Sequence, residues 1–286
     1  MRNKTTASLA ALALIGSSAI ALENPKAKAT KMNALSNREK TVQLLKSIET
    51  GDPAPVAYIN PNKYIQHNLS AADGLAGFGA LMAMLPKGSA KAKTARAFED
   101  GEFTFTHTEY DFFGPKIGFD IFRWENGQIV EHWDNLQETV TKTPSGHTMI
   151  DGPTGITDKD KTAANKKLVA NMVTDILMHG KVEMLKVYID EKHYTQHNPH
   201  IADGLSGLGS ALQAMAKQGI TMKYDAVNKV LGEGNFVLTA STGTFAGNLT
   251  AFYDLFRVEH GKIVEHWDVM ETIPPKGEWK NPNGKF

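Results

Sequence analysis

The chain has 286 residues, 41% of them hydrophobic, which is enough for two average domains with a core in each. Lysine and arginine (31) balance aspartate and glutamate (31), so no net charge favours nucleic acid or an anionic membrane as a partner, and we expect a small neutral ligand instead. Cysteine is absent, which excludes disulfides, thiolate metal sites and cysteine nucleophiles.

The N-terminus has the features of an exported protein. Two basic residues precede an apolar stretch, residues 7–22, and Ala19-Ile20-Ala21 has the small-residue spacing that signal peptidase reads. We predict a signal peptide over residues 1–21, a disordered leader over residues 22–36, and a periplasmic or secreted location without membrane attachment once the signal is removed. The alternative is a retained membrane anchor, although the apolar stretch is shorter than the ~20 residues that span a bilayer.

An internal repeat fills the rest of the chain. The block Tyr64-Ile65-Gln66-His67-Asn68 recurs as Tyr194-Thr195-Gln196-His197-Asn198. Residues 120–134 (DIFRWENGQIVEHWD) match residues 254–268 (DLFRVEHGKIVEHWD) at eleven of fifteen positions. Because both blocks keep their order and nearly their spacing, the chain is a tandem duplication.

The repeat divides the chain into segments. We predict one domain over residues 37–142 and a second over residues 159–278, followed by a C-terminal tail at 279–286. Residues 143–158 are rich in Gly, Pro, Ser and Thr and are predicted to form the interdomain linker.

Each copy opens with helices. Apolar residues at helical spacing, such as Val42, Leu45 and Ile48, predict an amphipathic first helix in each copy. The predicted N-caps are Ser36 in the first copy and Asp158 or Asp160 in the second. A short second helix follows and ends at the Tyr-x-Gln-His-Asn block, and a third helix is predicted over residues 75–84 and 205–216.

Three or four strands finish each copy. β-branched and aromatic residues predict strands over residues 103–108 and 236–241, and Asn126-Gly127 and His260-Gly261 are typical of hairpin turns between the last two strands. Helices followed by an antiparallel sheet indicate an α+β fold in both copies.

The last strand of each copy carries the first candidate site. Side chains two apart share a face of a strand, so His132 and Asp134 point one way, whereas Ile129, Glu131 and Trp133 point the other. The same alternation puts His266 and Asp268 on one face of the last strand of the second copy. These faces either line a polar pocket or hold a hydrogen-bonded pair that closes the end of a strand.

The Tyr-x-Gln-His-Asn blocks carry the second candidate site. His67 and His197 are candidate proton carriers, because an imidazole titrates near pH 6.5. Asp73 and Asp203, which follow, are predicted to cap the third helix of each copy. The polar residues predicted to ring the cavity mouths and bind substrate are Tyr64, Gln66, Asn68, Tyr194, Gln196, Asn198 and His200.

The two copies differ in histidine content. His107 lies in the middle of a strand where the second copy has Ala240, and His200 lies where the first copy has Ser70. We therefore expect the two sites to have unequal activity. Histidines on separate elements are weak grounds for a metal site, and we predict neither a metal nor another cofactor.

The repeated motifs resemble the SnoaL-like branch of the nuclear transport factor 2-like superfamily, over both copies. The resemblance implies two tandem cone-shaped α+β barrels, each with N-terminal helices packed in a curved antiparallel sheet around an apolar cavity. It also implies that the copies pair within one chain as family members pair in dimers. Leu69 departs from the usual Asn-Pro of this branch, which affects the mouth of the first cavity.

The resemblance further implies cofactor-independent removal of a proton next to a carbonyl, as in aldol-type cyclases, isomerases and dehydratases. It assigns the catalytic positions to Asp134, His132, His67 and His107 in the first copy and to Asp268, His266 and His197 in the second. The alternatives are a non-catalytic protein that binds a small apolar molecule in the same pocket, and an interaction protein whose cavities are filled by side chains.

Overall fold

The structure is a computed structural model that describes residues 35–86 and 88–286. The predicted signal peptide and nearly all of the predicted leader lie outside these residues. Among the described residues, no helix is long and apolar enough to cross a membrane.

The first barrel runs from α1 to β5. It contains α1 (Asn37–Thr50), a 3-10 helix (Ala54–Tyr58), β1 (Ile65–Gln66), α2 (Gly74–Met84), β2 (Lys91–Asp100), β3 (Phe103–Asp111), β4 (Pro115–Glu125) and β5 (Gln128–Glu138). As predicted, Ser36 caps α1, and its side chain forms a capping box with Glu39.

The second barrel repeats this plan from α3 to β10. A 3-10 turn (Lys159–Lys161) leads into α3 (Thr162–Met172), which continues as a π-helical segment (Val173–Met178) and is followed by a 3-10 turn (Val182–Met184). Then come α4 (Leu185–Tyr188), β6 (Thr195–Gln196), α5 (Gly204–Lys217), β7 (Met222–Glu233), β8 (Phe236–Phe245), β9 (Asn248–Glu259) and β10 (Lys262–Thr272). The prediction of Asp158 or Asp160 as the cap of α3 is wrong, because Lys161 takes the N-cap position, Asp160 lies within the 3-10 turn and Asp158 precedes that turn.

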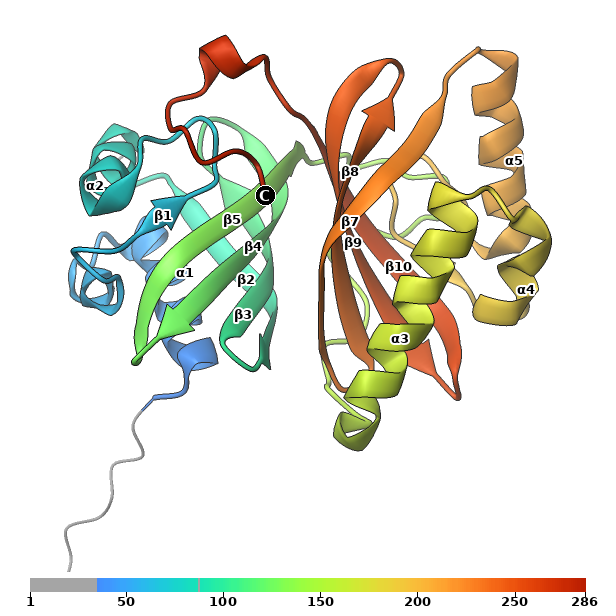
Figure 1. The fold of residues 1–286 in the computed structure, drawn as a ribbon, viewed down its shortest axis with the longest axis horizontal. Coiled ribbons are helices and arrows are strands. Elements are labelled where there is room, and N and C mark those ends of the chain that lie inside the picture. The colour runs from blue at the N-terminus through green and yellow to red at the C-terminus, as the bar shows by residue number, and fades with distance from the viewer. Residues whose placement is uncertain (1–34, 87) are drawn as a thin grey trace, which may run out of the picture. The chain divides into compact units, whose positions relative to one another are not determined.

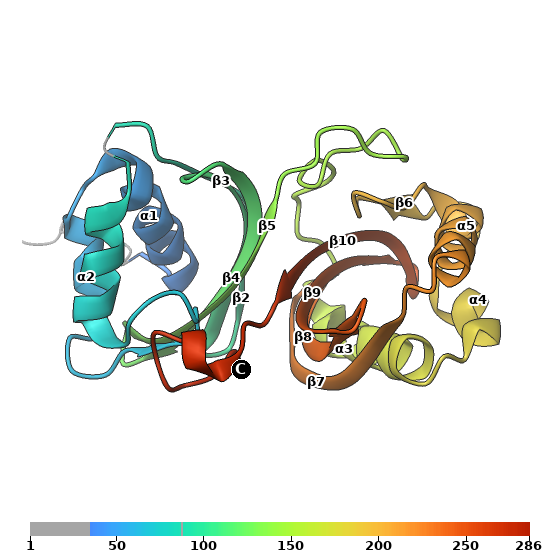
Figure 2. The same ribbon diagram turned by 90° about the horizontal axis from the view of Figure 1, so that it is seen from above.

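Each barrel is built on a five-stranded sheet, with strand orders β1-β5-β4-β3-β2 and β6-β10-β9-β8-β7. The sheets curve around the helices (Figure 2), and Leu44 and Leu45 of α1 pack against Phe122 and Trp124 of the concave face. The predicted fold class, two tandem α+β barrels, is confirmed. One detail differs: the Tyr-x-Gln-His-Asn block contributes a short strand that pairs in parallel with the last strand, so each sheet is mixed.

The predicted hairpin turns are present, but the alternation of side chains breaks just after them. Asn126 and Gly127 both have positive φ angles, as do His260 and Gly261, which suits a tight two-residue turn. A β-bulge then shifts the register in each hairpin, between Arg123 and Trp124 of β4 and between Ile263 and Glu265 of β10. An extra residue in a strand reverses the side of the sheet to which the residues before it point. The prediction that Ile129 shares a face with Trp133 is therefore wrong, since Ile129 packs inside the barrel with Leu44 and Phe122.

The convex faces of the two sheets share one hydrophobic core, which includes Phe98, Phe105 and Phe119 of the first barrel and Phe236 and Leu238 of the second. Hydrogen bonds between the barrels are reciprocal. Glu233 accepts from the backbone N–H of Glu99 at 2.8 Å, and Asp100 accepts from that of Gly232 at 3.0 Å. The residues from Leu35 to Phe286 form one compact unit.

The segments that follow β5 and β10 are exchanged between the barrels. The segment after β5 reaches the second barrel, where the carbonyl oxygen of Thr148 lies 2.8 Å from Nδ1 of His197. The tail after β10 crosses to the first barrel (Figure 1), where the carbonyl oxygen of Gly284 lies 2.9 Å from Nδ1 of His67. Each Tyr-x-Gln-His-Asn block is therefore held by chain that emerges from the other barrel.

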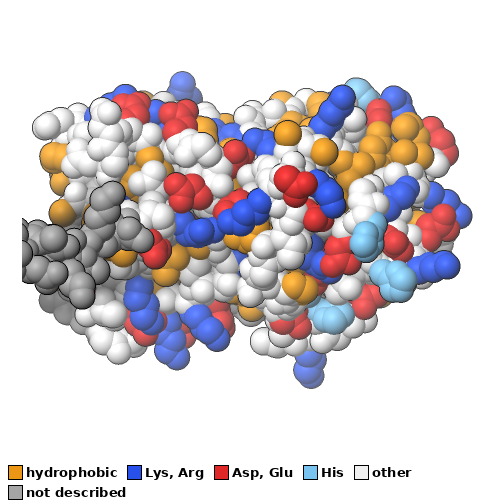
Figure 3. All heavy atoms as spheres, turned by 90° about the horizontal axis from the view of Figure 1, so that it is seen from below, with side chains coloured by type: hydrophobic (Ala, Val, Ile, Leu, Met, Phe, Trp, Pro, Cys, Tyr) orange, Lys and Arg blue, Asp and Glu red, His pale blue; other side chains and the backbone are white. Residues whose placement is uncertain are grey.

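The surface agrees with the balanced composition. On the face drawn in Figure 3, basic and acidic side chains are interspersed over both barrels wherever described residues form the surface. Charge on this face therefore does not gather into a patch of one sign.

Candidate functional site

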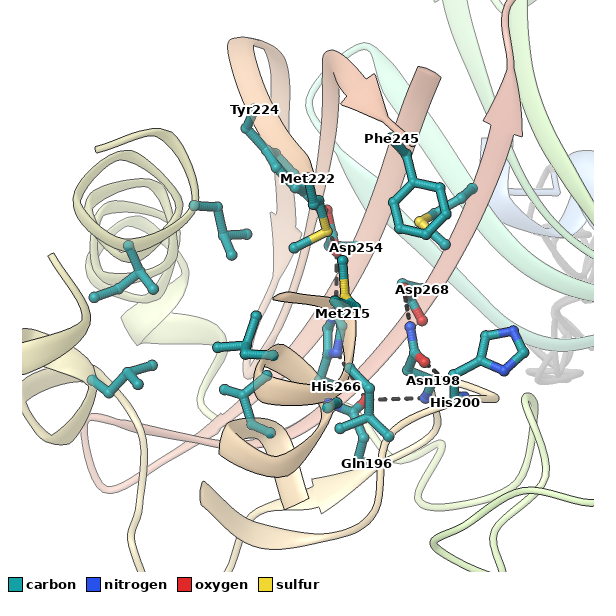
Figure 4. Close-up of a pocket in the computed structure, with 18 of the residues that line it drawn as sticks. Gln196, Asn198, His200, Met215, Met222, Tyr224, Phe245, Asp254, His266 and Asp268 are labelled. Carbon is teal, nitrogen blue, oxygen red and sulfur yellow. Dashed lines mark hydrogen bonds and ion pairs between the residues drawn. The ribbon is translucent and has the colours of Figure 1, made fainter. Parts of the chain in front are cut away.

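Each barrel encloses a cavity between its helices and the concave face of its sheet. The cavity of the second barrel has a volume of about 470 Å³ and that of the first about 450 Å³. Most of the lining is apolar, from residues such as Leu208, Met215 and Met222 in the second barrel. The polar end of the second cavity is formed by Tyr194, Gln196, Asn198, His200, Tyr224, Asp254, His266 and Asp268 (Figure 4).

Hydrogen bonds order the polar end of the second cavity. Nε2 of His266 lies 3.1 Å from Oδ1 of Asp254, and its Nδ1 lies 2.9 Å from Oε1 of Gln196. Asn198 donates from Nδ2 to Oδ2 of Asp268 at 2.7 Å. The parallel pairing of β6 with β10 sets Gln196 directly beside His266, which explains why the short strand matters for the site.

The first cavity has the same network. His132 lies 3.2 Å from Oδ1 of Asp120 and 3.0 Å from Oε1 of Gln66, and Asn68 donates to Oδ2 of Asp134 at 2.6 Å. The prediction that His132 and Asp134 face a pocket together, as do His266 and Asp268, agrees with this arrangement.

The hydrogen bonds determine the charge of His266. Oε1 of Gln196 accepts the backbone N–H of Asn198 at 3.0 Å, so it is an acceptor and Nδ1 of His266 must donate to it. The other ring nitrogen faces a carboxylate. Burial by itself would lower the pKa of His266, but the hydrogen bond to Asp254 and the charges of Asp268 and Asp254 outweigh burial and raise it. The contact with Asp254 therefore favours the protonated ring of His266 over the neutral one.

Asp268 is the carboxylate that remains available for proton transfer. Burial and the negative charge of Asp254 raise its pKa to about 6, against the lowering effects of His266, Asn198 and His200. Its Oδ1 is buried and has no hydrogen-bond partner among the described residues, and the same is true of Oδ1 of Asp134. Unsatisfied buried oxygens are rare, and these two border cavities.

Sequence reasoning missed the aspartate that pairs with each histidine. Asp120 and Asp254 open the two matching fifteen-residue segments, so their recurrence was visible in the sequence. What marks them as part of the site is their register opposite Asp134 and Asp268 in neighbouring strands, which only the folded sheets reveal.

Sequence reasoning also missed the tyrosine that forms a hydrogen bond with each of these aspartates, because the two barrels supply this tyrosine from different strands. Tyr110 of β3 donates to Asp120 at 2.6 Å, whereas Tyr224 of β7 lies 3.2 Å from both oxygens of Asp254. Tyr110 pairs with Ala92 across the strands, and Tyr224 pairs with Gly243. The tyrosine therefore lies on the inner strand of the pair in the first barrel and on the edge strand in the second, with a small residue opposite it in each. An alignment of the two copies does not reveal that both aspartates contact a tyrosine hydroxyl.

The prediction that His67 and His197 serve as proton carriers in the cavities disagrees with the structure. Their rings lie outside the cavities, at the interface between the barrels. His197 stacks on Trp267 with ring centroids 4.5 Å apart and lies 2.8 Å from Oε1 of Glu265. His67 stacks in the same way on Trp133 and lies 2.9 Å from Glu131. Alternation along the chain turns these rings away while Gln66, Asn68, Gln196 and Asn198 face inward.

His107 also lies outside the first cavity. It is fully buried between the two sheets, where it stacks on Phe119, and its Nδ1 lies 3.3 Å from Nη1 of Arg96. Burial and the charge of Arg96 hold the pKa of His107 well below its usual range, so the ring is neutral. Because the ring is buried between the two sheets, it does not reach a substrate in the cavity.

The remaining predicted site residues line the two cavities or lie next to them. Tyr64 and Tyr194 line their cavities, and burial raises the pKa of both hydroxyls, which keeps them protonated. His200 lines the second cavity, and Ser70 takes its place in the first. Asp73 precedes α2 at the N-cap position, but its carboxylate accepts the backbone N–H of Gln66 at 2.9 Å and not one from the helix.

The donor sets could also hold a metal ion. Asp254, His266 and Asp268 offer ligand atoms within 4.8 Å of one another, as do Asp120, His132 and Asp134. However, a metal would have to replace the ring proton that His266 directs at Asp254, because a metal-bound nitrogen carries no proton. The absence of a metal therefore stays a prediction, which a chelator tests.

No protein-family model matches the chain, and no curated protein matches it. Wild-type IdmH, a putative polyketide cyclase from Streptomyces antibioticus, is 21% identical over 37% of this chain and 91% of its own, with a TM-score of 0.29. A SnoaL-like polyketide cyclase from Agrobacterium tumefaciens is 13% identical over 37% of this chain and 91% of its own, with a TM-score of 0.31.

A third similar structure is a protein with a ketosteroid isomerase-like fold from Catenulispora acidiphila, solved in complex with trimethylamine. It is 14% identical over 35% of this chain and 85% of its own, with a TM-score of 0.30. The three structures each cover between 35% and 37% of this chain.

Proposed function

We propose that this is an exported enzyme that removes a proton next to a carbonyl group in a small apolar substrate, without a cofactor. The observation that carries the proposal is the buried Oδ1 of Asp268 and of Asp134, which accepts no hydrogen bond from the described residues and lies at the polar end of an apolar cavity. A carboxylate that has lost water and keeps one oxygen without a hydrogen bond is a stronger base than one in solution. The pKa of about 6 for Asp268 lets this residue both take and return a proton near neutral pH.

The reaction begins with the carboxylate. Asp268 takes the α-proton, and the electron pair of the broken C–H bond moves into the carbonyl group and forms an enolate. Proton return at another carbon gives isomerisation, and attack of the enolate on a second carbonyl gives an aldol-type ring closure. The imidazolium of His266 stays paired with Asp254 and keeps that neighbouring carboxylate neutralised.

The enolate oxygen needs a hydrogen-bond donor. Both ring nitrogens of His266 are engaged, so the histidine is not free for this role. Tyr194 is a better donor, because its hydroxyl accepts from Nε2 of Gln196 at 3.4 Å and donates to no other described residue. Tyr64 has the same position relative to Gln66, at 3.5 Å, in the first cavity. A protonated phenol aimed at a cavity stabilises an oxyanion as it forms.

The proposal also covers the export of the protein, the pairing of its two barrels and the bounds of its domains. The predicted signal peptide supports export to the periplasm or beyond. The shared core supports an intrachain pseudo-dimer, in which each barrel takes the place of one subunit. The predicted domains, residues 37–142 and 159–278, each contain the whole of one sheet.

The experiment is deuterium uptake at the α-carbon of a panel of small ketones and aldehydes, with the mature protein and the Asp134→Asn/Asp268→Asn variant. We expect uptake by the wild type and its loss in the double variant. Asp225→Asn, which changes an exposed aspartate of β7, is the matched control and keeps full activity. A wild-type rate that survives EDTA supports chemistry without a metal, and a rate that EDTA abolishes contradicts it.

A non-catalytic binding protein is the second candidate. The largely apolar lining and the volumes of about 450 and 470 Å³ suit capture of a small molecule as well as its conversion. Tight binding of a panel compound by wild type and double variant alike, without uptake of deuterium, favours this candidate.

A further inference from the structure

A group of metal-ligating side chains lies outside the linings of both cavities. It consists of His147 and Asp151 of the linker, His197 of the Tyr-x-Gln-His-Asn block, and Asp203, which precedes α5. His147, Asp151 and His197 each offer a ligand atom within 4.8 Å of the others. The group forms where chain that leaves the first barrel meets the second barrel.

Both imidazoles of this group direct the same ring nitrogen at Asp151. Nδ1 of His197 lies 2.8 Å from Oδ1 of Asp151, and Nδ1 of His147 lies 3.6 Å from Oδ2. The centroids of the two rings are 5.1 Å apart. Ligand atoms on one tetrahedral zinc ion lie about 3.4 Å apart, a value between these two nitrogen-to-oxygen distances. Two imidazoles and one carboxylate therefore face a common point.

The other nitrogen of each ring faces a second carboxylate. Nε2 of His197 lies 2.8 Å from Oε1 of Glu265, whose Oε2 accepts from Nε of Arg257 at 2.5 Å. Nε2 of His147 lies 3.4 Å from Oδ2 of Asp203. A histidine that binds a metal ion almost always directs its other N–H at a carboxylate, a carbonyl or water, which fixes the orientation of the ring. Both rings have such a carboxylate, and both leave Nδ1 for the metal.

The group is open to solvent on one side and fixed on the other. The side chains of His147 and Asp151 are 38% and 45% exposed, whereas that of His197 is fully buried. An ion can therefore enter from solvent and meet a ligand that is already in place. A metal at Nδ1 of His197 replaces the proton of that nitrogen, which passes to solvent. The carbonyl oxygen of Thr148, 2.8 Å from this nitrogen, and water are available as further ligands.

The first barrel has an amide at the corresponding position. Nδ2 of Asn283 donates to Oδ1 of Asp73 at 2.8 Å, where His147 faces Asp203 in the second barrel. Imidazole nitrogen suits transition metals such as zinc, whereas amide oxygen suits Mg²⁺ and Ca²⁺. The Asp-His-Asp groups of the cavities likewise contain one imidazole each. The linker group is therefore the better transition-metal site.

We propose that His147, Asp151 and His197 bind a divalent transition metal ion, for which zinc is the best match, and that the ion ties the linker to the second barrel. Sequence analysis predicted no metal because the histidines lie on separate elements, and the folded linker brings two of them together. His197 lies between Gln196 and Asn198, so the ion also steadies the two side chains that face the second cavity. The proposal is independent of the proposed function, because its ligands do not line that cavity.

The measurement is calorimetric titration of Zn²⁺ into the mature protein after treatment with EDTA. The Asp134→Asn/Asp268→Asn background keeps the cavity carboxylates from competing for the ion. We expect one zinc ion per chain in this background, and binding at least about tenfold weaker when His147→Asn or Asp151→Asn is added. His193→Asn changes a histidine that is 79% exposed and leaves zinc binding in place.

The variants also separate metal binding from folding. In the wild type, a hundredfold excess of free Zn²⁺ over its dissociation constant should raise the melting temperature by about 5 °C or more. His147→Asn, which introduces the residue of the first barrel at a partly exposed position, should melt at the same temperature with and without Zn²⁺. Equal circular dichroism of this variant and the wild type in EDTA shows that loss of the fold is not the cause.

A wild type that binds no zinc, or zinc binding that survives unchanged in either linker variant, overturns the proposal. Tighter binding of Mg²⁺ or Ca²⁺ than of Zn²⁺ overturns it as well. In His147→Asn, the effect of EDTA on deuterium uptake reports on the cavities alone. Loss of uptake there contradicts metal-free chemistry in the proposed function and leaves the linker site intact.

Discussion

Asn198 donates a hydrogen bond to Oδ2 of Asp268 at 2.7 Å and leaves Oδ1 of the same carboxylate without a partner among the described residues. Asn68 stands in the same relation to Asp134 at 2.6 Å. One oxygen is fixed by the amide, and the other is left to the cavity. This arrangement orients the carboxylate through one oxygen and leaves the other without a hydrogen bond, as the proposed base requires.

The raised pKa of Asp268 predicts an effect on stability. The carboxyl titrates at 3.8 when unperturbed and at about 6 in the folded chain, so folding becomes less favourable as pH rises through this interval. At neutral pH and above, the buried charge costs about 3 kcal/mol. Asp268→Asn should therefore unfold less readily than the wild type in urea at about pH 8 and equally readily near pH 4. An equal gain at both values of pH contradicts the assignment of the raised pKa.

His197 is predicted to matter for stability and not for catalysis. Its side chain is fully buried and lies 2.8 Å from both Asp151 and Glu265, so His197→Gln should cost about 3 kcal/mol or more of the free energy of unfolding. Deuterium uptake per folded molecule should stay unchanged, since the ring lies outside the cavity. Uptake that falls as far as in Asp268→Asn would return His197 to the catalytic machinery.

The helix α5 offers a matched pair of glycines beside the second cavity. A Cβ on Gly207 would lie 2.0 Å from the carbonyl oxygen of Ala202, whereas a Cβ on Gly209 would meet nothing within 4 Å. Gly207→Ala should cost about 1–3 kcal/mol of stability because backbone has to move. Gly209→Ala should be neutral or stabilise by up to about 1 kcal/mol, since alanine favours the helix. Thermal unfolding of both variants tests the packing of α5 against the backbone of Ala202, and equal melting temperatures contradict it.

The fold and half of the site were predictable because they rest on local patterns. The helical spacing of α1, the Asn-Gly and His-Gly turns and the recurring Asp134 and Asp268 are all visible in the sequence. The facing of a strand is lost where a bulge adds a residue, which is why the direction of Ile129 was predicted wrongly.

Pairing between distant segments accounts for the rest. The short parallel strands turn His67 and His197 outward and place Gln66 and Gln196 beside the site histidines, and no local signal reveals this. Tyr110 and Tyr224 reach equivalent aspartates from different strands, so comparison of the repeats conceals them. The exchange of the tail and the linker, which brings His147 and Asp151 to His197, depends on how the two barrels pack.

The most direct test of the account is the pH dependence of deuterium uptake by Asp134→Asn, in which only the second site is left. The account predicts that uptake rises with pH, with a midpoint near 6, and then levels off as Asp268 becomes fully charged. Uptake that does not depend on pH between about 4 and 8, or that continues unchanged when Asp268→Asn is added, would contradict the assignment of Asp268 as the base.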